Sequence, residues 1–180
     1  MPDSDAITSF ISLQSHAVVQ WKRHHKSWIE LWLEYRGETF QCGRCGRRYP
    51  KIYDREPIRL RDLDISKHRV YLWLPRYRVR CVECGVRRVE SRIARASARC
   101  TRRLERRLFI LTGHMTVKAV SEQERIHWTT VKDAEIRYIL GLLRKRDLSG
   151  ITSLGIDEVS EKKGHRYLTL VTDLTKRRVI

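Results

Sequence analysis

The chain has 180 residues, and 38 Lys and Arg against 21 Asp and Glu give it a formal net charge of +17 at pH 7. A charge of this sign and size suits a polyanionic partner, and nucleic acid is the one we expect. No apolar run approaches the roughly 18 residues of a membrane-spanning helix, so we expect no membrane association. The length suits one or two small domains with modest cores, which a bound metal ion would help to stabilise.

Residues 1–17 are polar and mixed in character, and they predict a tail or a short helix. The first five residues contain neither the basic nor the apolar region of a secretory signal. We therefore expect a cytoplasmic protein.

Residues 18–90 predict a strand-rich domain. Ile29, Leu31 and Leu33 alternate with Glu30 and Trp32, and a similar period of two recurs at 58–60 and 70–74. Such alternation is typical of strands that pack one face against a core.

Two Cys-x-x-Cys-Gly sequences occur in this domain, at residues 42–46 and 81–85. Two pairs of thiolates are what a closed tetrahedral zinc site requires, and the glycine after each pair tolerates the positive φ that such a turn usually needs. We expect the pairs at the ends of β-hairpins, as in a zinc ribbon with an insertion of 35 residues between them. The predicted structural zinc ligands are Cys42, Cys45, Cys81 and Cys84.

Two alternatives to a zinc site remain open for these cysteines. Two disulfides would need an oxidising compartment, and a thioredoxin-like redox role would need one pair in a βαβ setting. The fifth cysteine, Cys100, has no sequence partner and is expected to be a spare thiol.

Residues 91–148 change to a helical period. Thr101 is predicted to cap a helix that ends at Gly113, and Thr116 to cap a short second helix. A turn at 125–128 precedes a third helix capped by Thr129 or Thr130. The predicted buried stripe of this third helix is Val131, Ala134, Ile136, Ile139, Leu140 and Leu143.

A helix, a short helix, a turn and a longer helix form a helix-turn-helix arrangement, in which the start of the last helix meets base edges. Residues 76–107 add 12 arginines, no lysine and three glutamates, and arginine matches phosphate and guanine well. The alternative is that three short helices form only a core. The predicted DNA-binding residues are Arg102, Arg103, Arg106, Thr129, Thr130, Lys132 and Arg137.

Residues 149–180 predict three further strands. The first, at 154–159, is apolar but has Asp157 near its centre. A carboxylate in a buried strand is costly unless it is paired or binds a cation. A basic turn follows at 162–165, and we expect Asp173 to shape the turn after the second strand.

From about residue 40 to residue 180 the chain resembles the N-terminal part of bacterial insertion-sequence transposases of the ISL-three family. The resemblance rests first on the cysteine knuckles with residues 58–64 and 71–73, and second on Trp128-Thr-Thr-Val131 at the start of the last helix. The third and most specific motif is Leu154-Gly-Ile-Asp-Glu-Val-Ser160, followed by 163–167 and 169–173.

The resemblance implies an α+β chain with a zinc-ribbon-like domain at 18–90, a helix-turn-helix domain at 91–148 and, at 149–180, the first strands of an RNase H-like DDE catalytic domain. In such enzymes three carboxylates hold two divalent ions, usually Mg²⁺, and Asp157 matches the first carboxylate. The positions of the second Asp and the final Glu are not reached by Ile180. We therefore expect a truncated transposase that binds Mg²⁺ and cuts or joins DNA only if the domain is completed. Its strands lack the covering helices and are expected to expose apolar faces.

The resemblance implies double-stranded DNA at the ends of the element as the partner, in the bacterial cytoplasm and associated with the nucleoid. A homodimer is a further hypothesis. Two other functions stay open: a stand-alone zinc-dependent repressor or regulator of transposition without catalysis, and an RNA-binding zinc ribbon protein.

Overall fold

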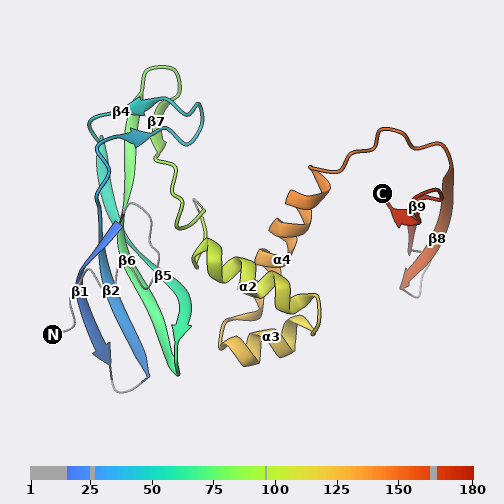
Figure 1. The fold of residues 1–180 in the computed structure, drawn as a ribbon, viewed down its shortest axis with the longest axis horizontal. Helices are drawn as coiled ribbons and strands as arrows, with labels where there is room; N and C mark the ends of the chain where they lie inside the picture. The colour runs from blue at the N-terminus through green and yellow to red at the C-terminus, as the bar shows by residue number, and fades with distance from the viewer. Residues whose placement is uncertain (1–15, 25–26, 96, 163–165) are drawn as a thin grey trace. The chain divides into compact units, whose positions relative to one another are not determined.

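The computed structural model describes residues 16–24, 27–95, 97–162 and 166–180 (Figure 1). The predicted tail at 1–17 and the basic turn at 162–165 lie almost entirely outside these residues. The chain divides into two compact units, of which the first ends at Tyr138 and the second is Ile139–Ile180.

The first unit is strand-rich, with three helices after the strands, as the α+β prediction requires. Its strands are β1 (His16–His24), β2 (Trp28–Tyr35), β3 (Phe40–Gln41), β4 (Arg48–Tyr49), β5 (Asp54–Ile65), β6 (His68–Cys81) and β7 (Gly85–Arg88). The described helices of this unit are α2 (Arg102–Thr112), α3 (Val117–Glu124) and α4 (Trp128–Leu143), the last of which continues into the second unit.

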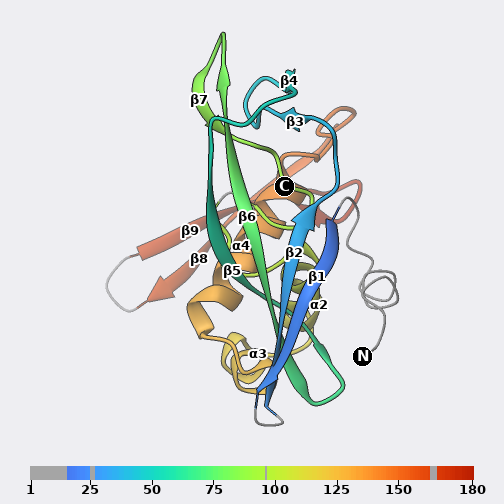
Figure 2. The same ribbon diagram turned by 90° about the vertical axis from the view of Figure 1, so that its left-hand side faces the viewer.

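The main sheet has the strand order β1-β2-β6-β5, with β7 paired to β6 (Figure 2). β5 and β6 form a long antiparallel hairpin, whereas β2 runs parallel to β6 over residues 28–32 and 69–73. The short hairpin β3–β4 and the hairpin β6–β7 lie at the same end of this sheet. The sheet therefore brings the two cysteine pairs to one place.

One face of the sheet is packed, which confirms the alternation seen in the sequence. Its core consists of Leu31, Leu33, Leu60, Val70, Leu72 and Leu74, covered by Ile93 and Ala94 from the segment before α2. On intervening positions, Trp32 and Trp73 stack with ring centroids 6.5 Å apart, and the guanidinium of Arg59 lies 3.7 Å from the ring centre of Tyr71.

The helices have the caps predicted for α2 and α3. The Thr101 and Thr116 side chains accept hydrogen bonds from Leu104 N and Ala119 N, and Gly113 caps the end of α2. The helical core consists of Cys100, Leu104, Leu108, Val120, Val131 and Ala134. Cys100 therefore serves as a small apolar core residue, and burial raises the pKa of its thiol to about 12.

Two predictions for α4 are wrong. The helix begins at Trp128, so neither Thr129 nor Thr130 caps it. His127 takes that place: its ring Nδ1 accepts a hydrogen bond from Thr129 N at 3.4 Å, and its backbone carbonyl accepts one from Thr130 N at 2.9 Å. Of the predicted buried stripe only Val131 and Ala134 are buried, whereas Ile136, Ile139, Leu140 and Leu143 are 41–47 % exposed. α4 has 16 residues against 11 and 8 in α2 and α3, and its residues from Ile139 onward belong to the second unit.

The second unit holds β8 (Leu154–Lys162), β9 (Arg166–Asp173) and β10 (Arg178–Val179), in the order β10-β9-β8. The expected burial of the first of these strands is wrong: Ile156 is 71 % exposed and Asp157 is exposed too. Exposed apolar side chains are what we predicted for uncovered strands. Asp173, in contrast, is buried and accepts from Thr175 N and Lys176 N at 3.1 and 3.0 Å, which confirms its role in the turn.

Among the described residues, no helix combines the length and the apolar character needed to cross a membrane.

Candidate metal centre and DNA-binding surface

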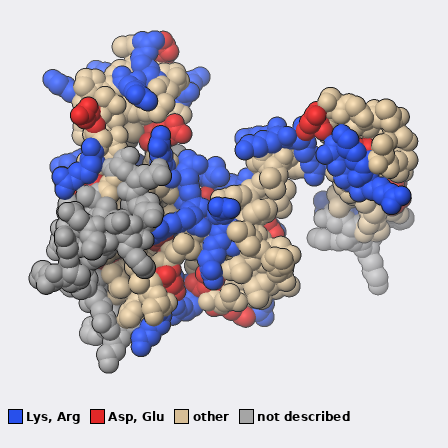
Figure 3. All heavy atoms as spheres, in the orientation of Figure 1, with Lys and Arg blue, Asp and Glu red and all other residues tan. Residues whose placement is uncertain are grey.

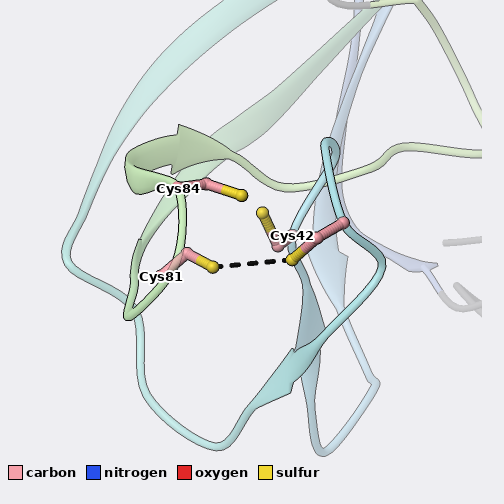
Figure 4. Close-up of side chains that lie close together, drawn as sticks. Cys42, Cys81 and Cys84 are labelled. Carbon is pink, nitrogen blue, oxygen red and sulfur yellow. Dashed lines mark hydrogen bonds between the residues drawn. The ribbon is translucent and has the colours of Figure 1, made fainter.

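The four predicted zinc ligands meet in one cluster at the tips of two hairpins. Cys42 follows β3 and Cys45 lies in the turn before β4, while Cys81 ends β6 and Cys84 precedes β7. Figure 4 shows the side chains of Cys42, Cys81 and Cys84 pointing toward a common centre. The predicted position at hairpin ends is confirmed.

The cluster fits a tetrahedral metal ion. All four Sγ atoms lie within 4.8 Å of one another, and those of Cys45 and Cys81 are 3.5 Å apart. A Zn–S bond of about 2.3 Å in a tetrahedron corresponds to S···S separations of roughly 3.8 Å. All five cysteines are free thiols in the structure, which does not support the disulfide alternative.

The turn glycines have the backbone conformation that the sequence predicted. Gly46 has φ of 77° and Gly85 has φ of 72°. In the first knuckle, Gly46 N donates to the carbonyl of Cys42 at 2.9 Å, and Cys42 N donates to the carbonyl of Arg47 at 2.8 Å. These bonds close the loop around the thiol of Cys42.

Tyr49 is a supporting residue that the sequence did not reveal. From β4 its hydroxyl accepts from Val82 N at 3.1 Å, and it also hydrogen-bonds the Cys81 thiol. The hydrogen bond from Tyr49, helped by the backbone N–H groups of Cys84 and Glu83, lowers the pKa of Cys81 to about 6 against the opposing effect of burial. Tyr49 thus ties the two hairpins together at the cluster.

The thiol of Cys84 behaves in the opposite way. Burial, and then hydrogen bonds with Cys45 and Cys81, raise its pKa to about 12. Without a metal, the cluster therefore keeps protons at pH 7, and these must leave when four thiolates bind a divalent ion.

The turn between α3 and α4 gives the helical part its helix-turn-helix form. Arg125 ends α3 in the left-handed conformation, with φ of 53° and ψ of 46°, and its guanidinium donates to Asp64 at 2.8 Å. The Ser121 hydroxyl donates to the carbonyl of Ile126 at 2.7 Å, which fixes the other side of the turn. The first turn of α4 is placed by these contacts and by burial of Val131.

The predicted DNA-binding residues differ in their exposure and in their partners. Lys132 and Arg106 are exposed and have no ion-pair partner in the part of the chain that the structure describes, and Thr129 and Thr130 are half-buried at the start of α4. Figure 3 shows Lys and Arg side chains gathered over α2 and the segment that leads into it.

Arg103 and Arg137 instead bind buried carboxylates. Arg103 donates through Nε at 2.7 Å and through Nη2 to Asp62, which is 0 % exposed. Arg137 donates at 3.0 Å to Glu105, which is 1 % exposed and also accepts from Arg95 at 3.0 Å. These bonds join β5 to α2 and α2 to α4.

Asp62 and Glu105 were missed from the sequence. Glu105 lies in the first turn of a helix, where a carboxylate is ordinarily an exposed and favourable residue. Nothing in the sequence signals that Arg95 and Arg137 enclose it. Arg102 differs from both the exposed and the carboxylate-bound arginines. It donates to the Ser91 carbonyl at 3.2 Å, and its buried Nε has no partner among the described residues.

Asp157 lies in β8 opposite Leu170 and accepts from Glu158 N at 2.8 Å. Among the described residues, the four cysteines are the only group of His, Cys, Asp or Glu placed to hold a metal ion together. Asp157 therefore belongs to no cluster of three or more potential metal ligands in the described part of the chain.

Comparison with known proteins identifies both domains. The zinc-finger of transposase IS204/IS1001/IS1096/IS1165 matches residues 38–84, and the helix-turn-helix domain of transposase family ISL3 matches residues 89–139. No solved structure is significantly similar to the chain.

Two curated relatives support the same family. The chain is 32 % identical over 184 residues to the transposase for insertion sequence element IS1001 of Bordetella parapertussis, covering 100 % of this chain and 45 % of the relative. It is 34 % identical over 143 residues to the transposase for IS1557 of Mycobacterium tuberculosis, covering 78 % of this chain and 32 % of the relative. The chain spans less than half the length of these relatives. It carries the zinc-finger and helix-turn-helix domains of the ISL3 family of insertion-sequence transposases, and belongs to that family.

Proposed function

We propose that the chain is the zinc-dependent, duplex-binding part of a transposase, and that it recognises the ends of an insertion sequence through the start of α4. The observation that carries this proposal is the α3–turn–α4 geometry, in which Lys132 is exposed and unpaired among the described residues. The first residues of a recognition helix are those that reach base edges in the major groove.

Zinc has a structural role in this proposal. Four cysteines leave no open position for water or substrate, which is the arrangement of a structural and not a catalytic zinc. The ion would hold hairpins β3–β4 and β6–β7 together and thereby fix the end of the sheet.

The predicted DNA-binding residues take different roles. Lys132, with Thr129 and Thr130, contacts bases, and Arg106 contacts phosphates. For Arg103 and Arg137 we assign a positioning role, because their guanidinium groups bind Asp62 and Glu105. Arg102 contacts phosphate from the start of α2.

A duplex selection followed by titration of the zinc-loaded chain at about 150 mM salt tests the proposal. A preferred sequence should bind some 10³-fold or more above random duplex. Replacing Lys132 with Ala should change the preference at one or two base pairs by about 1–3 kcal/mol. Lys67→Ala removes an exposed cation from the β5–β6 turn and serves as the matched control. Equal affinity for all duplexes would contradict sequence recognition.

Catalysis needs more than this chain in the proposal. Asp157 supplies the first carboxylate of an RNase H-like DDE site, and two carboxylates from elsewhere complete the binding of Mg²⁺. Replacing Asp157 with Ala should leave duplex affinity unchanged and should abolish strand transfer in a full-length transposase that contains the substitution. Loss of duplex binding would place Asp157 in the recognition surface.

A regulator of transposition without catalysis is the second candidate. It is favoured by the absence, among the described residues, of a cluster of three or more potential metal ligands that includes Asp157. Incubating the chain with element ends and Mg²⁺ separates the two functions, because a regulator would occupy the ends and protect them without cutting. The homodimer and the nucleoid location remain parts of the proposal, checked by analytical ultracentrifugation with and without DNA and by fluorescence imaging.

A further inference from the structure

A groove of about 1170 Å³ lies beside the zinc cluster in the first unit. It is lined by the end of β2, the first cysteine knuckle, the middle of β5 and β6, and residues 87–95 with Arg102. The groove exceeds the ~300–1,000 Å³ of ordinary small-molecule sites. It is therefore large enough for a segment of a polymer.

The charge of the groove is strongly positive. Nine arginines and two glutamates line it among the described residues. Several arginines already have partners, but the side chains of Arg44, Arg48 and Arg92 have no hydrogen bond or ion pair within the described part of the chain. Unpaired guanidinium groups gathered in one concave surface attract phosphate, which their planar fork can bind bidentately.

The groove also has an aromatic wall. The rings of Tyr35, Phe40 and Tyr77 all line it and lie against one another, with centroids 5.3 Å apart for Tyr35–Phe40 and 5.0 Å apart for Phe40–Tyr77. The three rings are only half-buried. Aromatic rings beside a basic groove are the combination by which proteins hold unpaired nucleotides, because each base stacks on a ring while arginines bind the phosphates.

The walls of the groove are fixed by backbone hydrogen bonds. Gly43 N donates to the Arg88 carbonyl at 3.0 Å and Glu90 N to the Gln41 carbonyl at 2.9 Å. A Cβ on Gly43 would lie 2.9 Å from the Arg88 oxygen, so the two segments are in close contact. The groove is thus preorganised by the same knuckle that holds the metal ligands.

We propose that this groove binds a stretch of unpaired single-stranded DNA, with phosphates on Arg44, Arg48 and Arg92 and bases against Tyr35, Phe40 and Tyr77. The proposal builds on the proposed duplex binding by α4 but uses different residues. It gives the protein a second DNA site, suited to a strand that has been separated from its complement next to the bound duplex.

The test compares two fluorescence anisotropy titrations of the zinc-loaded chain, one with labelled oligothymidylate and one with the selected duplex. The oligothymidylate has about 15 nucleotides, within the ~4–16-nucleotide range of single-strand sites. The triple variant R44A/R48A/R92A should bind the single strand at least about tenfold more weakly and should lower its salt slope by about 2, at roughly 0.7 per phosphate contact. Its duplex affinity should change less than threefold. Tyr77→Leu should weaken single-strand binding without changing the salt slope.

The matched control is K51A/K67A/R99A, which removes the same charge from exposed positions outside the groove. Lys132→Ala should weaken selected-duplex binding and leave the single strand unaffected. The proposal is overturned if the wild-type chain does not bind the single strand, if the control triple loses as much affinity as the groove triple, or if the groove triple loses single-strand and duplex binding equally. If the wild-type chain binds the single strand but shows no sequence preference among duplexes, that result would count against the role of α4 and not against the groove.

Discussion

Gly85 adopts φ of 72° at the point where the second knuckle turns into β7, and a Cβ at this position would meet no atom within 4 Å. The glycine is therefore required for its backbone conformation and not for space. An L-residue in the left-handed region costs about 1–2 kcal/mol per residue.

Replacing Gly85 with Ala should accordingly destabilise the zinc-loaded chain by about 1 kcal/mol. Gly141→Ala is the matched control, because Gly141 lies in α4 with open space around its Cβ, and alanine there should stabilise the helix by up to about 1 kcal/mol. Urea unfolding midpoints measure both. Equal effects of the same sign would show that the turn does not constrain residue 85.

Arg103 and Arg106 lie three residues apart in α2 and differ in their partners. Arg103 compensates the buried Asp62, whereas Arg106 is exposed and has no ion pair among the described residues. Breaking a fully buried pair costs about 3–5 kcal/mol, and the 35 % exposure of the Arg103 side chain reduces this value.

We expect Arg103→Ala to lower the free energy of unfolding by about 2–3 kcal/mol. Arg106→Ala should change it by less than about 0.5 kcal/mol and should instead reduce the slope of log K against log salt for duplex by about 0.9. Chemical denaturation and salt titration of the two variants give a direct comparison. A stable Arg103→Ala variant with weakened DNA binding would restore Arg103 as a direct DNA contact.

At the scale of elements, the zinc hairpins join parts of the chain that the sequence separates by 35 residues. Among the described residues, the small core beneath them consists of Cys42, Val79 and Cys81, packed by half-buried neighbours such as Tyr49. A core of this size contributes little apolar burial, so the metal must supply much of the local stability.

Chelation should therefore unfold the hairpins β3–β4 and β6–β7. Cys81→Ser should release zinc and lose the same structure, because one missing thiolate leaves the site incomplete. Cys100→Ser is the control, because Cys100 lies in the helical core. This variant should keep stoichiometric zinc although it is less stable. A zinc assay combined with near-ultraviolet circular dichroism distinguishes the variants. Hairpins that stay folded after chelation would contradict the structural role of zinc.

The elements also show which structural features can be predicted from sequence patterns. Both knuckles and the caps Thr101 and Thr116 could be predicted, because each depends on residues close together in the sequence. The exposure of Ile139 and Leu140 could not, because a helical period shows which side chains share a face and not whether another element covers it. The buried carboxylates Asp62 and Glu105 were likewise hidden, since only long-range packing brings their arginines to them.

Within the first unit, the sheet and the helices are connected by backbone as well as by ion pairs. Arg61 N donates to the Arg99 carbonyl and Thr101 N to the Arg61 carbonyl, both at 3.0 Å. At the other end of the connecting segment, Glu90 N is bonded to the carbonyl of Gln41 beside the zinc cluster. The segment that leads into α2 is thus fixed at both ends, and loss of one end should affect the helices.

Removing zinc should therefore weaken duplex binding even though none of the residues proposed to contact the duplex lies near the cysteines. Hydrogen exchange of the zinc-free chain should show faster exchange in residues 88–95 and at the start of α2. The amides of β8 and β9, which belong to the second unit, provide the internal control and should keep their protection. If α2 keeps full protection while duplex affinity falls, zinc acts on duplex binding through the hairpins themselves, and the coupling through the connecting segment is refuted.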